Sequence, residues 1–199
     1  MKNIKITLPD NSIKEVPIGT TPQEVANLIG PGLARAVVVS KVDGNLKDLN
    51  YPLDNDCSLQ LFTGDTPEGH DTLLHSTAHL MAQAVKVLYP ETKVTIGPTI
   101  ENGFYYDFDV DVPFTDEIII KIEKKMKDLA KSSQEIYRKE ITSKEAVSFF
   151  KKIKEDYKVE IVNQINQDDL ITTYRQSDFV DLCRGPHVSN TSKIKYFKL

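Results

Sequence analysis

Two short motifs contain three of the chain's four histidines and one of its two cysteines. His75 and His79 are four residues apart, so on a helix both imidazoles point the same way, about one turn apart. Cys183 and His187 flank Gly185-Pro186, a pair that forbids a helix and predicts a turn. Three imidazoles and a thiol are ligand types of tetrahedral zinc, and a catalytic zinc site would keep one position open for water or substrate.

Other readings of these residues stay open. Two histidines on a helix are commonly partly buried polar residues that bind no ligand. Cys57 and Cys183 are the only cysteines, which is too few for a disulfide framework, so any cysteine chemistry would be that of a thiol or thiolate.

Composition predicts an ordinary folded protein. The chain has 199 residues, 40% of them hydrophobic and 27% charged, which is enough for two modest domains. The net charge is -4, but residues 121–154 carry eleven Lys or Arg against five Asp or Glu. This segment is either a phosphate-facing surface or simply a solvated helix face. We find no apolar leader and no apolar run of membrane-spanning length, and we expect a cytoplasmic protein.

Residues 1–63 predict a small β-grasp domain. Alternation at residues 3–8 and a second extended run to Val16 indicate a hairpin. Thr21 is a suitable N-cap for a helix beginning at Pro22 and stopped by the glycines around Pro31. Two further strands follow, at residues 36–42 and 58–62.

Residues 64–70 read as a linker, and residues 71–199 as a second, α+β domain. A helix capped by Asp71 and stopped by Pro90 would carry the two spaced histidines beside an apolar stripe. The remaining pattern predicts extended segments at 93–100 and 103–108, helices at 115–131 and 143–154, and strands at 158–162, 171–174 and 179–182.

Longer motifs surround the chemical residues. Leu74-His-Ser-Thr-Ala-His-Leu80, the segment Ile96–Asp107 and the segment Asp181–His187 occur in the order found in the N-terminal part of the threonyl-tRNA synthetase family, which this sequence resembles along its whole length. The resemblance implies a TGS β-grasp domain at 1–63 and an editing domain at 71–199. The family continues into an ATP-dependent catalytic domain, which holds ATP, magnesium and zinc. We therefore expect a fragment or a freestanding editing protein, without ligase activity.

The resemblance also implies a reaction and roles for residues. Losing one methyl group changes binding by only about 1–3 kcal/mol, so serine mischarged on threonine tRNA would need a second, hydrolytic site. His75 would contact the ribose and help activate water, and Lys158 would be the second catalytic group. A lysine must be desolvated to act as a base. The other expected site residues are His79, Cys183 and His187 beside the catalytic pair, and Tyr106, Asp181 and Arg184 around the substrate.

The resemblance also implies what metal and which partners to expect. The histidines and cysteine resemble the zinc site of related alanyl-tRNA editing domains, but the threonyl family implies a metal-free reaction, which we expect here. The partner would be the acceptor end of threonine tRNA, with the fragment monomeric and the full-length enzyme a homodimer. Two alternatives are a zinc-stabilised tRNA-binding module without activity and a ligand-sensing β-grasp regulator. The first would unfold on chelation, and the second would reside in residues 1–63.

Overall fold

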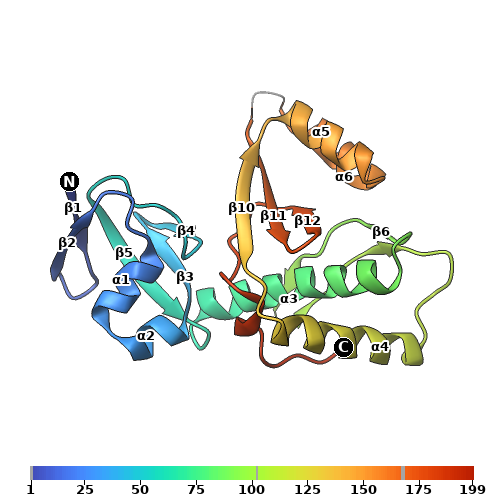
Figure 1. The fold of residues 1–199 in the computed structure, drawn as a ribbon, viewed down its shortest axis with the longest axis horizontal. Coiled ribbons are helices and arrows are strands. Elements are labelled where there is room, and N and C mark those ends of the chain that lie inside the picture. The colour runs from blue at the N-terminus through green and yellow to red at the C-terminus, as the bar shows by residue number, and fades with distance from the viewer. Residues whose placement is uncertain (1, 102, 167–168) are drawn as a thin grey trace. The chain divides into compact units, whose positions relative to one another are not determined.

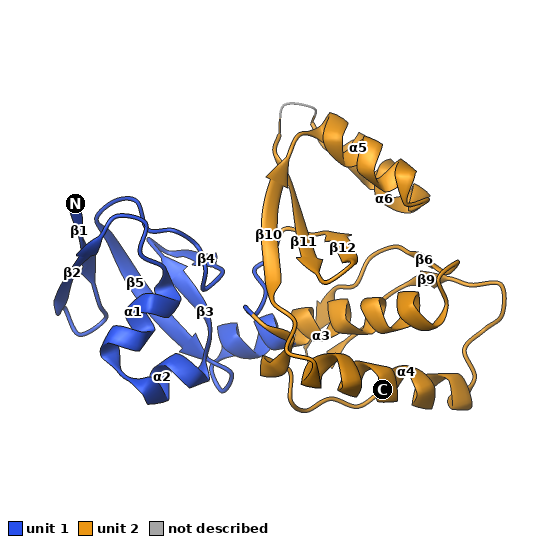
Figure 2. Ribbon diagram, viewed as in Figure 1, with its two compact units in different colours: residues 1–73, 185–189 blue, residues 74–184, 190–199 orange. Residues whose placement is uncertain are grey.

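The computed structural model describes residues 2–101, 103–166 and 169–199, and its contacts divide the chain into two units (Figure 2). The first unit contains residues 1–73 with 185–189, and the second contains residues 74–184 with 190–199. Asn102, which belongs to the motif at Ile96–Asp107, lies outside the described residues. Within the described ranges, no helix is both long and apolar enough to cross a membrane.

The first unit is a five-stranded mixed sheet with two helices (Figure 1). The strand order is β2-β1-β5-β3-β4, with β1 parallel to β5 and the other pairs antiparallel. This arrangement confirms the predicted β-grasp fold. Its elements are β1 (Asn3–Thr7), β2 (Ile13–Pro17), α1 (Pro22–Ile29), α2 (Pro31–Ala36), β3 (Val37–Val42), β4 (Asn45–Lys47) and β5 (Cys57–Thr63).

Local sequence explains these elements. Ile4 and Ile6 alternate with exposed residues along β1 and pack into an aliphatic core. Thr21 caps α1 in a reciprocal box with Glu24, as predicted. The helix α2 was not predicted: the glycines around Pro31 end α1, but Pro31 then occupies the first turn of a new helix, where proline is well tolerated.

The second unit is α+β, also as predicted, and contains several small sheets (Figure 1). β10, β11 and β12 form an antiparallel sheet, and β6–β9 and β7–β8 form two-stranded sheets. The elements from residue 67 onward are α3 (Pro67–Leu88), β6 (Lys93–Val94), β7 (Thr99–Ile100), β8 (Gly103–Phe104), β9 (Phe108–Asp109), α4 (Asp116–Lys131), β10 (Ile136–Ile141), α5 (Ser143–Lys152), α6 (Asp156–Gln164), β11 (Ile171–Gln176), β12 (Phe179–Leu182) and the 3-10 turn η1 (Thr191–Lys193).

Two sequence predictions are wrong. Asp71 does not cap α3, because the helix begins at Pro67, within the predicted linker. The strand predicted at 158–162 is the helix α6. Its β-branched residues suggested a strand, but Val159 and Val162, three residues apart, pack on one helix face with Phe150 and Ile171. Tertiary packing has overridden local propensity here.

Candidate functional site

A cavity of about 790 Å³ lies within the second unit. Its wall includes most of the predicted site residues, carried by α3, α6, β12 and the segments that follow β8 and β12. The residues are His75, His79, Ile96, Gly97, Pro98, Tyr106, Lys158, Ile161, Gln164, Ile165, Asp169, Leu170, Ile171, Thr172, Asp181, Leu182, Cys183 and Arg184.

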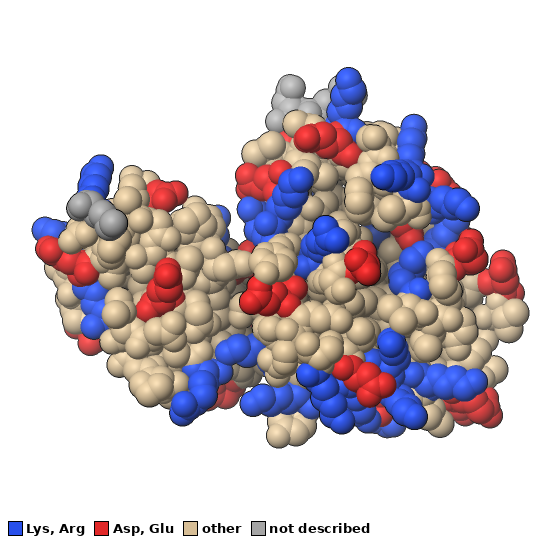
Figure 3. All heavy atoms as spheres, viewed as in Figure 1, with Lys and Arg blue, Asp and Glu red and all other residues tan. Residues whose placement is uncertain are grey.

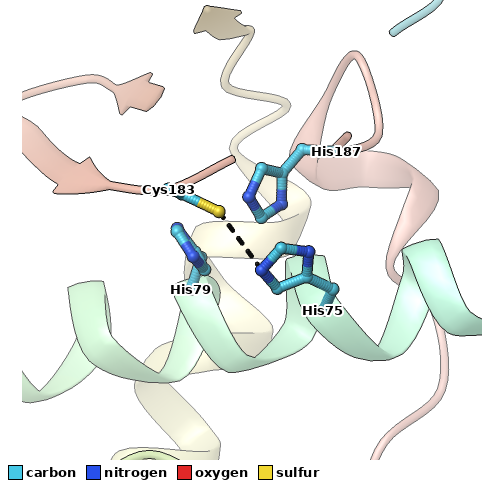
Figure 4. A group of neighbouring side chains, drawn as sticks. All are labelled: His75, His79, Cys183 and His187. Atoms are coloured by element: carbon cyan, nitrogen blue, oxygen red, sulfur yellow. Dashed lines mark hydrogen bonds between the residues drawn. The ribbon is translucent and has the colours of Figure 1, made fainter. Parts of the chain in front are cut away.

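The α3 histidines face the segment after β12, as the spacing predicted. The rings of His75 and His79 meet edge to face, with centroids 5.2 Å apart. His75 Nε2 is 3.2 Å from the Sγ atom of Cys183 (Figure 4). His75 is half-buried, whereas His79 is 5% exposed. His75 is therefore the histidine of this pair that solvent and substrate can reach more easily.

The predicted quartet is also close together: one ligand atom from each of His75, His79, Cys183 and His187 lies within 4.8 Å of the others (Figure 4). This donor set fits zinc, which binds imidazole nitrogen at about 2.0–2.1 Å and thiolate at about 2.3 Å. His187 belongs to the segment 185–189, which is grouped with the first unit, and its backbone N–H donates to Asp48 Oδ1 at 2.8 Å.

A buried polar network forms the floor of the cavity. Lys158 Nζ lies 2.5 Å from Asp181 Oδ1 and donates to the hydroxyl of Tyr106 at 3.0 Å and to the carbonyl of Thr95 at 2.6 Å. The Tyr106 hydroxyl donates to Asp181 Oδ2 at 2.6 Å. Lys158 and Asp181 are 2% and 1% exposed. An ammonium has three N–H donors, so these three oxygens satisfy all of them.

Burial and charge set the protonation of this network. Burial lowers the pKa of His79 to about 3, although the nearby Asp181 carboxylate opposes the shift. His79 is therefore neutral near pH 7, and its 3.6 Å contact with Asp181 is not an ion pair. Burial raises the pKa of Tyr106 well above its usual value, and Asp181 adds to this effect. Burial would raise the pKa of Asp181, but the charge of Lys158, together with the hydrogen bonds from Lys158 and Tyr106, more than offsets it, so the net shift is downward.

Two site residues were missed in the sequence. The carbonyl of Thr95 receives a Lys158 hydrogen bond, and no side-chain pattern could have identified it. Gly97 lies within the motif Ile96–Asp107 and was given no role of its own, but a Cβ there would lie 2.2 Å from Tyr106 Cδ2, so the ring of Tyr106 requires glycine at this position. The place of Gly97 in the motif Ile96–Asp107 was the sequence feature that could have identified it as a site residue. Arg184 lines the cavity and is exposed, in keeping with its expected position near a phosphate.

The basic segment 121–154 contains α4, β10 and α5. Figure 3 shows Lys and Arg side chains gathered along the edge of the second unit where α4 lies, with Asp and Glu among them. Lys121, Lys124, Lys127 and Lys131 are exposed on α4. The surface is suitable for a polyanion, but the contact itself remains a prediction.

Comparison with known proteins gives two family matches and close relatives. Residues 4–63 match the TGS domain, and residues 171–199 match the threonyl and alanyl tRNA synthetase second additional domain. The chain is 53% identical over 199 residues to a threonine–tRNA ligase of Geobacter sp. (strain M21), covering 100% of the chain and 31% of that protein. It is 50% identical over 196 residues to the threonine–tRNA ligase of Acetivibrio thermocellus, covering 98% of the chain and 31% of that protein.

These matches agree with the resemblance seen in the motifs. The chain spans about 31% of the length of these curated relatives. It is thus related along its whole length to the N-terminal part of the threonine–tRNA ligases, with a TGS domain and the second additional domain of threonyl- and alanyl-tRNA synthetases.

Proposed function

We propose that the second domain hydrolyses the ester of serine mischarged on threonine tRNA. The observation that carries this proposal is the cavity of about 790 Å³ whose floor is the buried network of Lys158, Asp181 and Tyr106, with the half-buried His75 on its wall. The similarity to threonine–tRNA ligases supports the tRNA as partner. The need to remove serine supports the reaction, because one methyl group gives only about 10–200-fold discrimination in binding.

In this reaction a water oxygen attacks the ester carbon, and the bond to the ribose oxygen breaks. His75 would orient the water, accept its proton and return a proton to the leaving ribose oxygen. The Cys183 thiol, 3.2 Å from His75 Nε2, would fix the orientation of the ring. Arg184 would bind phosphate near the acceptor end.

The buried network would hold the amino acid. The carboxylate of Asp181 would bind the ammonium or hydroxyl of serine, and the Tyr106 hydroxyl would direct the substrate or water. Lys158 contacts three acceptors, which supports a role as a fixed cation that orients Asp181 and Tyr106 and favours negative charge developing nearby, in place of a role as a free base. His79, neutral near pH 7, would complete the wall.

Deacylation of two charged tRNAs tests the proposal. The parent chain should release serine from threonine tRNA while threonine-charged tRNA persists. His75→Ala should slow serine release by about 100-fold, the usual contribution of a positioned acid–base group. His70→Ala is the matched control, because His70 is an exposed histidine earlier on α3. Equal rates for parent and His75→Ala would contradict the assignment of His75.

Metal content distinguishes the alternatives. Zinc held by His75, His79, Cys183 and His187 would supply Lewis acidity and an activated water. We propose the metal-free reaction, so chelation should leave both deacylation and the melting temperature unchanged. Stoichiometric zinc whose removal abolishes deacylation would overturn the metal-free reaction. Unfolding on chelation, in a chain without deacylation, would instead support a zinc-stabilised tRNA-binding module, which the four clustered donors favour as the second candidate.

Assembly is the remaining part of the proposal. We propose that the chain is a monomer, that threonine tRNA binds by its acceptor end, and that the full-length relatives are homodimers. Sedimentation velocity tests the first statement, and a clearly dimeric chain would contradict it.

A further inference from the structure

A buried carboxylate outside the proposed chemistry lies one helical turn before Lys158. Glu155 is 3% exposed, and both of its carboxylate oxygens are engaged. Oε1 lies 2.7 Å from the ammonium of Lys86 on α3, and Oε2 accepts the backbone N–H of Val94 on β6 at 3.1 Å. Glu155 is the N-cap of α6, yet its side chain makes no capping hydrogen bond with that helix. The side chain instead joins α6 to two other elements.

These contacts restrain both the backbone of Lys158 and the segment that contains one of its hydrogen-bond acceptors. Val94 is followed by Thr95, whose carbonyl accepts from Lys158 Nζ at 2.6 Å. The carbonyl of Glu155 accepts the backbone N–H of Lys158 at 3.1 Å, in the first turn of α6. Glu155 therefore restrains both the start of α6, which carries Lys158, and the end of β6. The strand β6 directly precedes Thr95, whose carbonyl accepts from Lys158.

Lys86 extends the same restraint to α3. It lies seven residues after His79, two helical turns along the same face. Besides Glu155, its ammonium donates to the carbonyls of Pro90 and Thr92, at 2.8 Å each. This pair of a buried glutamate and a partly exposed lysine thus joins the end of the helix that bears the histidines to the start of the helix that bears Lys158.

We propose that Glu155, paired with Lys86, is a positioning residue that fixes Lys158 Nζ on Asp181, Tyr106 and the Thr95 carbonyl. The inference rests on the proposed function for its effect on turnover, but the placement of Lys158 can be measured without turnover.

The next residue offers a matched control. Asp156 pairs with Lys93 on the same strand β6, but the Asp156 side chain is 62% exposed. Exposed ion pairs contribute little to stability, whereas losing a buried carboxylate leaves the groups that it pairs with unsatisfied. Asp156→Asn should therefore leave Lys158 in place, while Glu155→Gln should release it, because glutamine has one acceptor oxygen where the glutamate uses two.

The first measurement is single-turnover and steady-state release of serine from charged threonine tRNA. Glu155→Gln should lower kcat by about 10–100-fold with KM within about twofold, because misplacing a group by about 1 Å can cost that much in rate. Asp156→Asn should stay within about twofold of the parent for both constants. A raised KM with parent kcat would contradict the positioning role.

The second measurement is the acetylation rate of Lys158 by acetic anhydride, followed by peptide mass spectrometry on the folded chain. Glu155→Gln should acetylate Lys158 about tenfold faster than the parent, and Asp156→Asn at the parent rate, because only an amine released from its three acceptors is accessible. A parent without deacylase activity would refute the proposed function and leave this comparison intact. Equal acetylation in Glu155→Gln and the parent would refute the positioning role.

A second variant covers the case in which Glu155→Gln does not fold. Replacing Lys86 and Glu155 together by methionine removes the ion pair without leaving a lone buried charge, a change that is often neutral or stabilising. Circular dichroism and thermal unfolding check its fold. This folded double variant should show the same faster acetylation of Lys158 and the same lowered kcat. Parent-like values for both would overturn the proposal.

Discussion

The two domains differ in how many charged residues they bury: the first domain buries Asp48, and the second buries several. A core cluster of the first domain is aliphatic, with Ile4, Ile6, Val16, Val25, Val42, Leu53 and Leu59 as its buried members. The second domain has an apolar core too, but it also buries His79, Glu155, Lys158 and Asp181, each no more than 5% exposed. Burying charge is costly unless every group is paired and hydrogen-bonded.

The two domains therefore differ in how burial affects their stability. Apolar burial in the first domain contributes directly to its stability. Buried charged groups are often no better than neutral for stability, so the presence of His79, Lys158 and Asp181 in the wall of one cavity points to a site in which their positions matter. Substitutions in the two domains should therefore separate stability from activity.

The largest effect should come from Lys158→Met. It removes the cation 2.5 Å from Asp181 and leaves a carboxylate buried without its main counterion. Breaking such a pair costs about 3–5 kcal/mol, so the second domain should lose most of its stability. Serine release should fall by at least about 100-fold where the domain is still folded. Thermal unfolding and the deacylation assay measure the two effects.

An exposed lysine provides the control for this substitution. Lys151→Met on α5 removes the same charge from a solvated position and should change neither measurement. If Lys158→Met melted at the temperature of Lys151→Met, the ion pair would not be the restraint that we infer.

Leu59→Ala tests the contribution of the aliphatic core of the first domain. Leu59 is fully buried in the first domain, and truncating such a leucine costs about 2–5 kcal/mol. Hydrogen exchange should show faster opening of β1, β3 and β5, while serine release at low temperature should stay within about twofold of the parent rate. A large loss of activity in a folded Leu59→Ala chain would show that the first domain participates in the chemistry.

Gly97→Ala should have an intermediate effect confined to the cavity. The added Cβ would meet Tyr106 Cδ2 at 2.2 Å, so the ring must move and weaken its 2.6 Å hydrogen bond to Asp181. Overpacking of this kind costs about 1–3 kcal/mol, and serine release should slow by about tenfold. Gly103→Ala is the control, since its nearest contacts would be at 3.6 Å and it should behave like the parent.

The comparison also explains which parts of the fold the sequence predicts. In the first domain β1 alternates apolar and exposed residues and β3 is a buried, β-branched run, and both were found nearly to the residue. In the second domain β6, β7, β8 and β9 are two residues each, too short for a periodic pattern. β10 was missed because its central residues, Arg138, Lys139 and Glu140, are exposed and charged, as is typical of an edge strand.

The site residues differ in the same way. Some can be placed from their sequence neighbours, and others depend on tertiary contacts. The spacing of His75 and His79 specifies a shared helix face, and Gly185-Pro186 specifies a turn, so both motifs could be placed from local rules. Lys158 was placed on a strand, and nothing in its own neighbourhood indicates that its ammonium would meet Asp181, 23 residues away. Contacts of that kind depend on tertiary packing, and the resemblance to a family was the only route to them.

The smallest predicted effect comes from a capping box that occurs once in each domain. Thr21 with Glu24 and Thr142 with Glu145 form the same capping box, one in each domain. In each box the threonine N–H, and then its hydroxyl, lowers the pKa of the glutamate below its usual 4.5. A carboxyl whose pKa is lower in the folded state stabilises the fold above the unfolded pKa, and this contribution is lost as the pH falls through the folded pKa.

Glu24→Gln and Glu145→Gln should therefore each lower the melting temperature slightly at pH 7 and have a smaller effect as the pH falls well below 4.5, where the parent glutamates become protonated. Melting curves between pH 7 and pH 3 provide the measurement. Because each box is exposed and none of its residues lines the cavity, both variants should deacylate at the parent rate. A difference between the two in activity, with Glu145→Gln slower, would mean that α5 transmits strain to α6, which it contacts through Phe150 and Val159, and so to Lys158.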